Sequence, residues 1–130
     1  MDPRLLDVAR RAMAQAHAPY SNFHVGAAIL ADDGNIYAGC NVENAAFPEG
    51  WCAETTAIGA MVTGGAKHIV EITVMGEGKE FTTPCGGCRQ RIAEFAGPET
   101  PVHICGPEGV RCTFKLEELL PASFGKGHLS

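Results

Sequence analysis

The chain has 130 residues, of which 45% are apolar and 19% charged, and its formal net charge is −5. This balance is typical of one folded domain over residues 1–130, and the negative charge argues against binding nucleic acid through its phosphates. The longest apolar runs are too short to cross a membrane. No secretory segment precedes the first predicted helix, so we expect a cytoplasmic protein with reduced cysteines.

The first half of the chain predicts a helix followed by a hairpin. After the helix start signal Asp2-Pro3, apolar residues share one helical face: Leu5, Val8, Ala12, Met13 and Ala16. The segment Pro19-Tyr20-Ser21-Asn22 ends this helix. Strands are then expected over residues 25–31 and 36–42, because an Asp-Gly turn at residues 32–35 separates two apolar runs.

The second half alternates between helices and strands. Helices are predicted over residues 52–63, after Pro84 to about residue 95, and over 114–120; strands are predicted over 68–76, 102–105 and 110–113. Gly64-Gly65 and Gly97-Pro98 are the stop signals of the first two helices. The order α-β-β-α-β-α-β-β-α predicts an α/β fold, a five-stranded mixed sheet in a three-layer α/β/α sandwich.

Two short motifs carry metal-binding chemistry, Cys52-Ala53-Glu54 and Pro84-Cys85-Gly86-Gly87-Cys88. Each lies at the predicted start of a helix, where the partial positive charge favours a thiolate. Cys85 and Cys88 are three residues apart and so share one helical face. If Cys52 meets them, three sulfurs leave a fourth position of the metal open for water, the pattern of a catalytic zinc site.

Other interpretations of these cysteines stay open at this point. A CxxC pair alone can be a redox motif or half of a structural zinc site. A structural site needs a fourth ligand, and Cys40, Cys105, Cys112 or His103 could provide one. Glu54 favours catalysis, because a carboxylate that does not bind the metal can move the protons of a metal-bound water. The three other cysteines fit better as small buried apolar residues in strands.

Beyond these motifs, nearly the whole chain resembles the small, homotetrameric, zinc-dependent cytidine deaminases of the cytidine/deoxycytidylate deaminase superfamily. The two motifs match the three-cysteine form of the zinc-deaminase signature. The other matching segments are Ala18-Pro19-Tyr20-Ser21-Asn22-Phe23, Val25-Gly26-Ala27-Ala28, Gly39-Cys40-Asn41-Val42-Glu43-Asn44, Cys88-Arg89-Gln90 and Leu119-Leu120-Pro121.

The resemblance implies an enzyme of pyrimidine salvage that hydrolyses cytidine and 2′-deoxycytidine to the uridine nucleosides and ammonia. Zn²⁺ is the implied cofactor, with Cys52, Cys85 and Cys88 as its ligands. A zinc-bound hydroxide would attack C4 of the base, and Glu54 would shuttle the protons. The implied partners are the nucleoside and three further copies of the chain, with no nucleic acid and no membrane.

The resemblance also implies a set of substrate-binding residues, namely Phe23, Asn41, Glu43, Ala53 and Phe124. Asn41 and Glu43 would hold the ribose 3′-hydroxyl, since an amide can donate to a hydroxyl and a carboxylate can accept from it. Phe23 would stack on the base, and Phe124 would close the pocket of a neighbouring subunit. The plainer alternatives are a loop-capping Asn41, a solvated Glu43 and a core Phe23.

One position departs from the family pattern, which commonly reads Cys-Ala-Glu-Arg-Thr-Ala where this chain has Thr55 in place of the arginine. Three thiolates around Zn²⁺ leave an excess negative charge that weakens the pull of the metal on water. We expect Arg89 and backbone N–H groups to offset this charge, and Thr55 to donate to a sulfur. The segment Glu49-Gly50-Trp51 is also less typical of the family.

Three other functions fit these residues less well than cytidine deamination does. Another small aminohydrolase, such as a blasticidin-type deaminase, would have no use for the ribose ligands Asn41 and Glu43. A polynucleotide deaminase would need a basic groove, which the acidic balance does not favour. A zinc-stabilised binding module without activity would have no need of Glu54.

Overall fold

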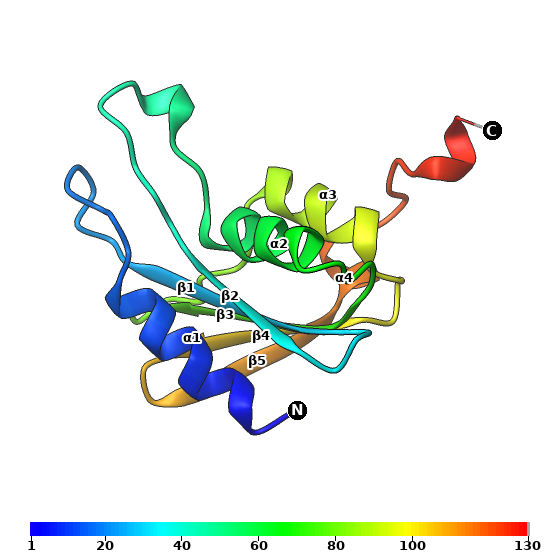
Figure 1. Cartoon of the computed structure of the whole chain (residues 1–130), viewed down its shortest axis with the longest axis horizontal. Coiled ribbons are helices and arrows are strands. Elements are labelled where there is room, and N and C mark those ends of the chain that lie inside the picture. The colour runs from blue at the N-terminus through cyan, green and yellow to red at the C-terminus, as the bar shows by residue number, and fades with distance from the viewer. Residues whose placement is uncertain (130) are drawn as a thin grey trace.

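The computed structural model describes residues 1–129 and contains one five-stranded mixed sheet with strand order β2-β1-β3-β4-β5 (Figure 1). The strands are β1 (Val25–Ala31), β2 (Ile36–Cys40), β3 (Ile69–Gly76), β4 (Pro101–Gly106) and β5 (Gly109–Lys115). The helices are α1 (Arg4–Ala14), α2 (Ala53–Thr63), α3 (Gly86–Phe95) and α4 (Leu116–Leu119), with 3₁₀ turns η1 (Phe47–Glu49) and η2 (Lys126–His128). Both the predicted element order and the α/β architecture are confirmed.

Helices cover both faces of the sheet, with α1 on one side and α2 and α3 on the other (Figure 1). Side chains of a strand alternate between its faces, so β1 serves both layers. Ala27 and Ile29 belong to the larger core, which is shared with α2 and α3, and Ala28 packs with Leu5 and Ala9 of α1. No helix within residues 1–129 is long and apolar enough to span a membrane.

The register of the strands brings the starts of α2 and α3 to the same edge of the sheet. Cys40, the last residue of β2, pairs with Gly26 at the start of β1, and Val25 pairs with Gly76 at the end of β3. The chain leaves β2 and β3 at this edge and turns back into α2 and α3 respectively. Gly39 allows α2 to lie close to β2, since a Cβ there would come within 2.8 Å of the Thr56 Cβ.

Several predicted boundaries are wrong. The first helix ends at Ala14 and leaves out Ala16. The second strand ends at Cys40 and not at residue 42, because Val42 leaves the ladder and forms isolated bridges with His17 and Trp51. The last helix begins at Leu116, since Phe114 still pairs with β4 as part of β5. The second of these shifts places residues 41–43 in a loop at the edge of the sheet.

Candidate active site

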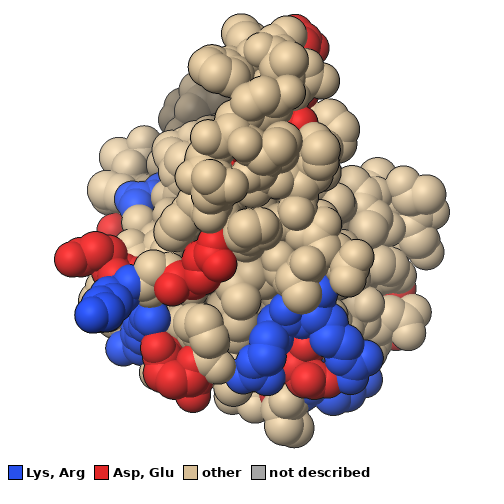
Figure 2. Space-filling view, turned by 90° about the vertical axis from the view of Figure 1, so that its left-hand side faces the viewer, with Lys and Arg blue, Asp and Glu red and all other residues tan. Residues whose placement is uncertain are grey.

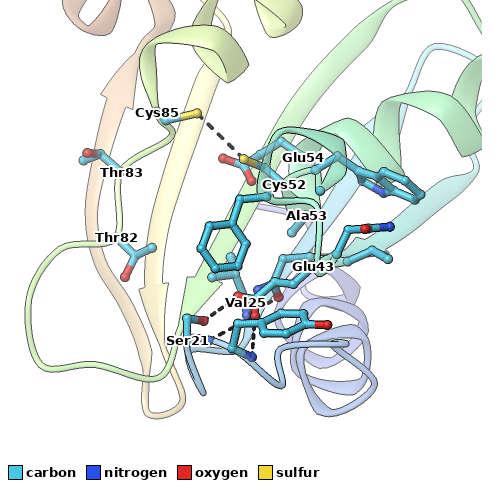
Figure 3. A pocket seen from close by; sticks show the side chains of 16 residues that line it. Ser21, Val25, Glu43, Cys52, Ala53, Glu54, Thr82, Thr83 and Cys85 are labelled. Atoms are coloured by element: carbon cyan, nitrogen blue, oxygen red, sulfur yellow. Dashed lines mark hydrogen bonds between the residues drawn. The ribbon is translucent and has the colours of Figure 1, made fainter.

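The sulfurs of Cys52, Cys85 and Cys88 form a cluster in which all three lie within 4.8 Å of one another. Cys52 is the N-cap of α2, Cys85 is the N-cap of α3, and Cys88 lies in the first turn of α3. The Cys52 and Cys85 sulfurs are 3.8 Å apart (Figure 3). A tetrahedral zinc with Zn–S bonds of about 2.3 Å places its sulfurs roughly 3.8 Å from each other, so this set fits a zinc ion.

The pKa values of the cysteine thiols in the cluster depend on one another. A hydrogen bond with Cys88 lowers the pKa of the Cys52 thiol, and the same bond together with burial raises the pKa of Cys88. From the other helix, the Thr55 hydroxyl lies 3.8 Å from the Cys88 sulfur. This is the contact expected of Thr55. A divalent cation bound to the three sulfurs displaces the thiol protons, so metal binding and proton release are coupled.

None of the side chains named as a possible fourth ligand belongs to the cluster in the described part of the chain. The two ring nitrogens of His103 lie 2.8 Å from a Glu71 oxygen and 2.9 Å from the Thr113 hydroxyl. Cys105 is buried in the core beneath α1. Within the described residues, the metal-binding group comprises the three cysteines of α2 and α3. Three protein ligands are the arrangement of a catalytic rather than a structural zinc site.

Glu54 places a buried carboxylate next to this cluster. It lies in the first turn of α2 with only 4% of its surface exposed, and its side chain lies beside the Cys52 sulfur (Figure 3). Burial raises the pKa of its carboxyl group. A carboxylate held this close to a metal centre, and shielded from water, is suited to accepting and returning protons.

A cavity of about 620 Å³ opens at the cluster and is large enough for a nucleoside-sized ligand. Cys52, Glu54 and Cys85 lie at one end of it, and Asn41, Glu43 and Ala53 also line it. Other lining residues were not predicted from the sequence: Val25, Phe47, Gly50, Trp51, Thr82 and Thr83. Val25 is the first residue of β1 and Phe47 lies in η1, whereas the other positions lie in loops, whose course the spacing of apolar residues does not reveal.

Asn41 and Glu43 organise the loop that precedes β1 as well as facing the cavity. The Asn41 amide donates to the Phe23 carbonyl and accepts from the Val25 N–H, both at 2.9 Å. Glu43 accepts from the backbone N–H groups of Tyr20 and Ser21 and from the Ser21 hydroxyl. The Ser21 bonds lower the pKa of Glu43, so this carboxylate is ionised at neutral pH. Each side chain keeps further hydrogen-bonding capacity for a ligand.

The two phenylalanines proposed for the substrate are not among the residues that line the cavity. The Phe23 ring lies beside Gly78, where an added Cβ would come within 3.3 Å of it. Phe124 is 57% exposed, stacks on His128, and its carbonyl accepts a hydrogen bond from Gln90. The C-terminal segment projects away from the body of the chain (Figure 1), so Phe124 is free to meet another molecule.

The expectation that Arg89 faces the sulfurs is wrong. Its guanidinium donates to the Pro84 carbonyl at 2.7 Å, to the Leu119 carbonyl at 2.9 Å and to the Thr83 hydroxyl at 3.2 Å. Adjacent residues on a helix point in different directions, so Arg89 reaches α4 and not the cluster. The cation beside the cluster is Arg91, whose Nη1 lies 3.6 Å from the Cys88 sulfur. The sequence did contain a signal for this contact, because Arg91 follows Cys88 by three residues and so lies on the same face of the helix.

Comparisons with known proteins agree with this geometry. The family model described as "Cytidine and deoxycytidylate deaminase zinc-binding region" matches residues 1–104. A cytidine deaminase of Sporosarcina psychrophila is 41% identical over 127 residues, which cover 98% of this chain and 93% of that one. A cytidine deaminase of Mycobacterium tuberculosis is 41% identical over 119 residues, covering 90% and 84%.

Solved structures resemble the chain equally well. The crystal structure of cytidine deaminase from Burkholderia pseudomallei superposes with a TM-score of 0.88 at 38% identity, covering 95% of this chain and 99% of that one. Cytidine deaminase from Mycobacterium tuberculosis gives a TM-score of 0.81 at 37% identity, covering 94% and 95%. The similarity therefore extends through the sheet and all three layers.

Proposed function

Because the chain belongs to the cytidine and deoxycytidylate deaminase family of zinc-dependent enzymes, we propose that it hydrolyses cytidine and 2′-deoxycytidine to uridine and 2′-deoxyuridine, with release of ammonia. The observation that carries this proposal is the buried Glu54 carboxylate beside three clustered sulfurs at the end of a nucleoside-sized cavity. A structural zinc site has no need of such a carboxylate.

Each part of the site has a separate task in the proposed reaction. A zinc ion held by Cys52, Cys85 and Cys88 would lower the pKa of a water molecule and so supply the nucleophile. Glu54 would take one proton from the attacking water and pass it to N3 of the base, which makes C4 more electrophilic, and the oxygen of that water would bond to C4. Glu54 would then carry the second proton of that water to the amino group, whose bond to C4 breaks, so that ammonia leaves and a C4 carbonyl remains; one carboxylate thus serves as base and acid in turn.

The nucleoside would lie along the cavity with its base towards Glu54 and its ribose towards Asn41 and Glu43. The ionised Glu43 accepts a hydrogen bond from the 3′-hydroxyl, which cytidine and 2′-deoxycytidine share. Ala53 is buried at the start of α2 and lines the cavity, where it would contact the base. We retain Phe23 as the proposed stacking partner of the base.

The surface charges support a small substrate in preference to a polynucleotide. On the face shown in Figure 2, the Lys and Arg side chains are interspersed with Asp and Glu, and the upper part of the face is largely uncharged. A polynucleotide deaminase needs a continuous basic path for the phosphates. The net charge of −5 points the same way.

Glu43→Gln is expected to lower kcat/KM for cytidine about 10- to 100-fold, mainly through a higher KM, because a charged hydrogen bond to the 3′-hydroxyl is lost. Steady-state kinetics with cytidine and with 3′-deoxycytidine measure this. The second substrate is the control, since it lacks the hydroxyl and reports any disturbance of the loop around Ser21. An equal loss on both substrates would remove Glu43 as the sugar ligand.

We also propose that residues 1–130 act as one deaminase domain that assembles into a cytoplasmic homotetramer with shared pockets. The exposed Phe124 supports the assembly, because its ring is apolar and lies outside the pocket of its own chain. The three-thiolate site supports a cytoplasmic location, because cysteines stay reduced in the cytoplasm.

Light scattering during gel filtration is expected to show four chains in the active species. Phe124→Ala is expected to raise KM for cytidine about tenfold, which is the size of effect expected from the loss of one aromatic contact. A fully active monomer would contradict the shared pocket.

The overall reaction is tested by mixing the zinc-loaded protein with cytidine and following absorbance in the cytosine band together with released ammonia. The expected result is one ammonia for each uridine formed. A protein that binds zinc and leaves both nucleosides unchanged would be a binding module and not a deaminase.

A further inference from the structure

The zinc site proposed above carries an excess of negative charge that the chain must offset. Three cysteine thiolates outweigh the two positive charges of a zinc ion by one. The thiolates repel one another, and a site of low polarity screens this repulsion poorly. The two helix N-termini supply only partial positive charges.

The cation closest to the sulfurs is on α3. Arg91 follows Cys88 by three residues, so the two side chains share one face of the helix. Its Nη1 lies 3.6 Å from the Cys88 sulfur, whereas every guanidinium nitrogen of Arg89 donates to an oxygen elsewhere. Arg91 is therefore placed to donate a charge-assisted hydrogen bond to a thiolate.

The first turn of α3 leaves room for this guanidinium. Gly87 has no side chain, and a Cβ there would come within 3.1 Å of the Arg91 Nη1 and 3.7 Å of its Cζ. A larger residue at position 87 would push the guanidinium away from Cys88. From α2, Thr55 offers the same sulfur only a hydroxyl, at 3.8 Å. The positively charged side chain beside the Cys88 sulfur is therefore Arg91 of α3, because Thr55 of α2 is neutral.

We propose that Arg91 is a positioning residue of the zinc site, which offsets the thiolate charge through Cys88 and slows the loss of the metal. It acts through the ligand and touches neither substrate nor metal. The inference rests on the proposed zinc enzyme, but it concerns metal retention, so it can be tested without measuring deamination.

The test measures how fast the holoenzyme releases zinc to an excess of a coloured chelator. Arg91→Gln is expected to release zinc about tenfold faster, the lower end of the effect of losing an outer-shell partner, because the Arg91 side chain is exposed and partly screened by solvent. Arg91→Lys keeps the charge and is expected to release zinc at an intermediate rate. Arg11→Gln, which removes an exposed arginine from α1, is the control for net charge and is expected to match the wild type.

Moving the charge to the other helix separates electrostatics from packing. The double variant Thr55→Arg with Arg91→Gln is expected to return the release rate to within about threefold of the wild type, since position 55 faces the same sulfur. The difference between wild type and Arg91→Gln is also expected to shrink in high salt.

Two results would overturn the proposal. The first is zinc release from Arg91→Gln within twofold of the wild-type rate. The second is a faster release that neither the double variant nor the Arg91→Lys variant reduces, or that salt leaves unchanged, because a purely structural role predicts this. Circular dichroism of each variant checks folding. Failure of the proposed function would appear separately, as a zinc-loaded wild type without deaminase activity.

Discussion

Replacing Glu54 by glutamine is expected to lower kcat for cytidine by about three to four orders of magnitude while zinc stays bound. Glutamine keeps the size and hydrogen bonding of the side chain but cannot accept and return a proton. Proton transfer by a placed side chain contributes typically about 10²- to 10⁴-fold, and here one carboxylate makes two transfers. Because Glu54 is buried, no bulk water can replace it directly.

The controls for this substitution are zinc content and a matched variant. Zinc per chain and the thermal unfolding midpoint are expected to be close to the wild-type values, since glutamine removes a buried charge without leaving a cavity. Glu94→Gln, the same change at a half-exposed position on α3, is expected to keep full activity. If Glu54→Gln retained activity within tenfold of the wild type, Glu54 would not be the proton shuttle.

Replacing Cys85 by alanine is expected to abolish both zinc retention and activity, because two sulfurs are too few for a zinc site that survives dialysis. Cys85 is exposed at the N-cap of α3, so its loss leaves no cavity in the core. Atomic absorption after dialysis measures the metal. The expected content is below about a tenth of the wild-type value, which corresponds to a loss of at least ~1.4 kcal/mol in binding.

Cys112→Ala is the matched control, since Cys112 is a partly exposed cysteine on β5 and outside the cluster. It is expected to keep both zinc and activity. The wild type stripped by a chelator should lose activity and regain it with added Zn²⁺, whereas Cys85→Ala should not. A Cys85→Ala protein with a full complement of zinc would remove Cys85 from the ligand set.

The element order and the sandwich could be predicted because apolar periodicity and turn residues mark them locally. Val25–Ala31 was predicted with its observed bounds, since Pro19 and Gly34 bracket an unbroken apolar run. The end of β2 could not be predicted, because Val42 continues the apolar pattern but pairs with His17 and Trp51, which are distant in the sequence. The last helix was placed too early for the same reason, since Phe114 pairs with β4.

The sequence indicated the metal cluster but not which charged side chain lies beside it. The spacing of Cys85 and Cys88 and the predicted helix starts at Cys52 and Cys85 indicated that three sulfurs could meet, and the family resemblance implied that they do. Which arginine meets them depends on the direction of each side chain around α3. Adjacency in the sequence suggested Arg89, whereas the helical period selects Arg91, and only the structure displays the contact with Cys88.

The loops that line the cavity were the least predictable part of the site. Trp51 donates its indole N–H to the Thr56 hydroxyl and so fixes the loop before Cys52, a contact that residue type alone does not reveal. Thr82 and Thr83 reach the cavity from the loop between β3 and α3. The hydrogen bonds of Asn41 to the Phe23 carbonyl and Val25 N–H likewise depend on how the chain returns to the edge of the sheet.

The central claim is that this chain uses water to remove the amino group of cytidine, and incubation of the zinc-loaded protein with cytidine in ¹⁸O-labelled water tests it most directly. Mass spectrometry of the product is expected to show uridine with one solvent-derived oxygen on the base, formed together with one ammonia and absent from the Glu54→Gln protein. Uridine incubated alone with the enzyme is the control for exchange. Cytidine recovered unchanged, or uridine without the label, would contradict the claim.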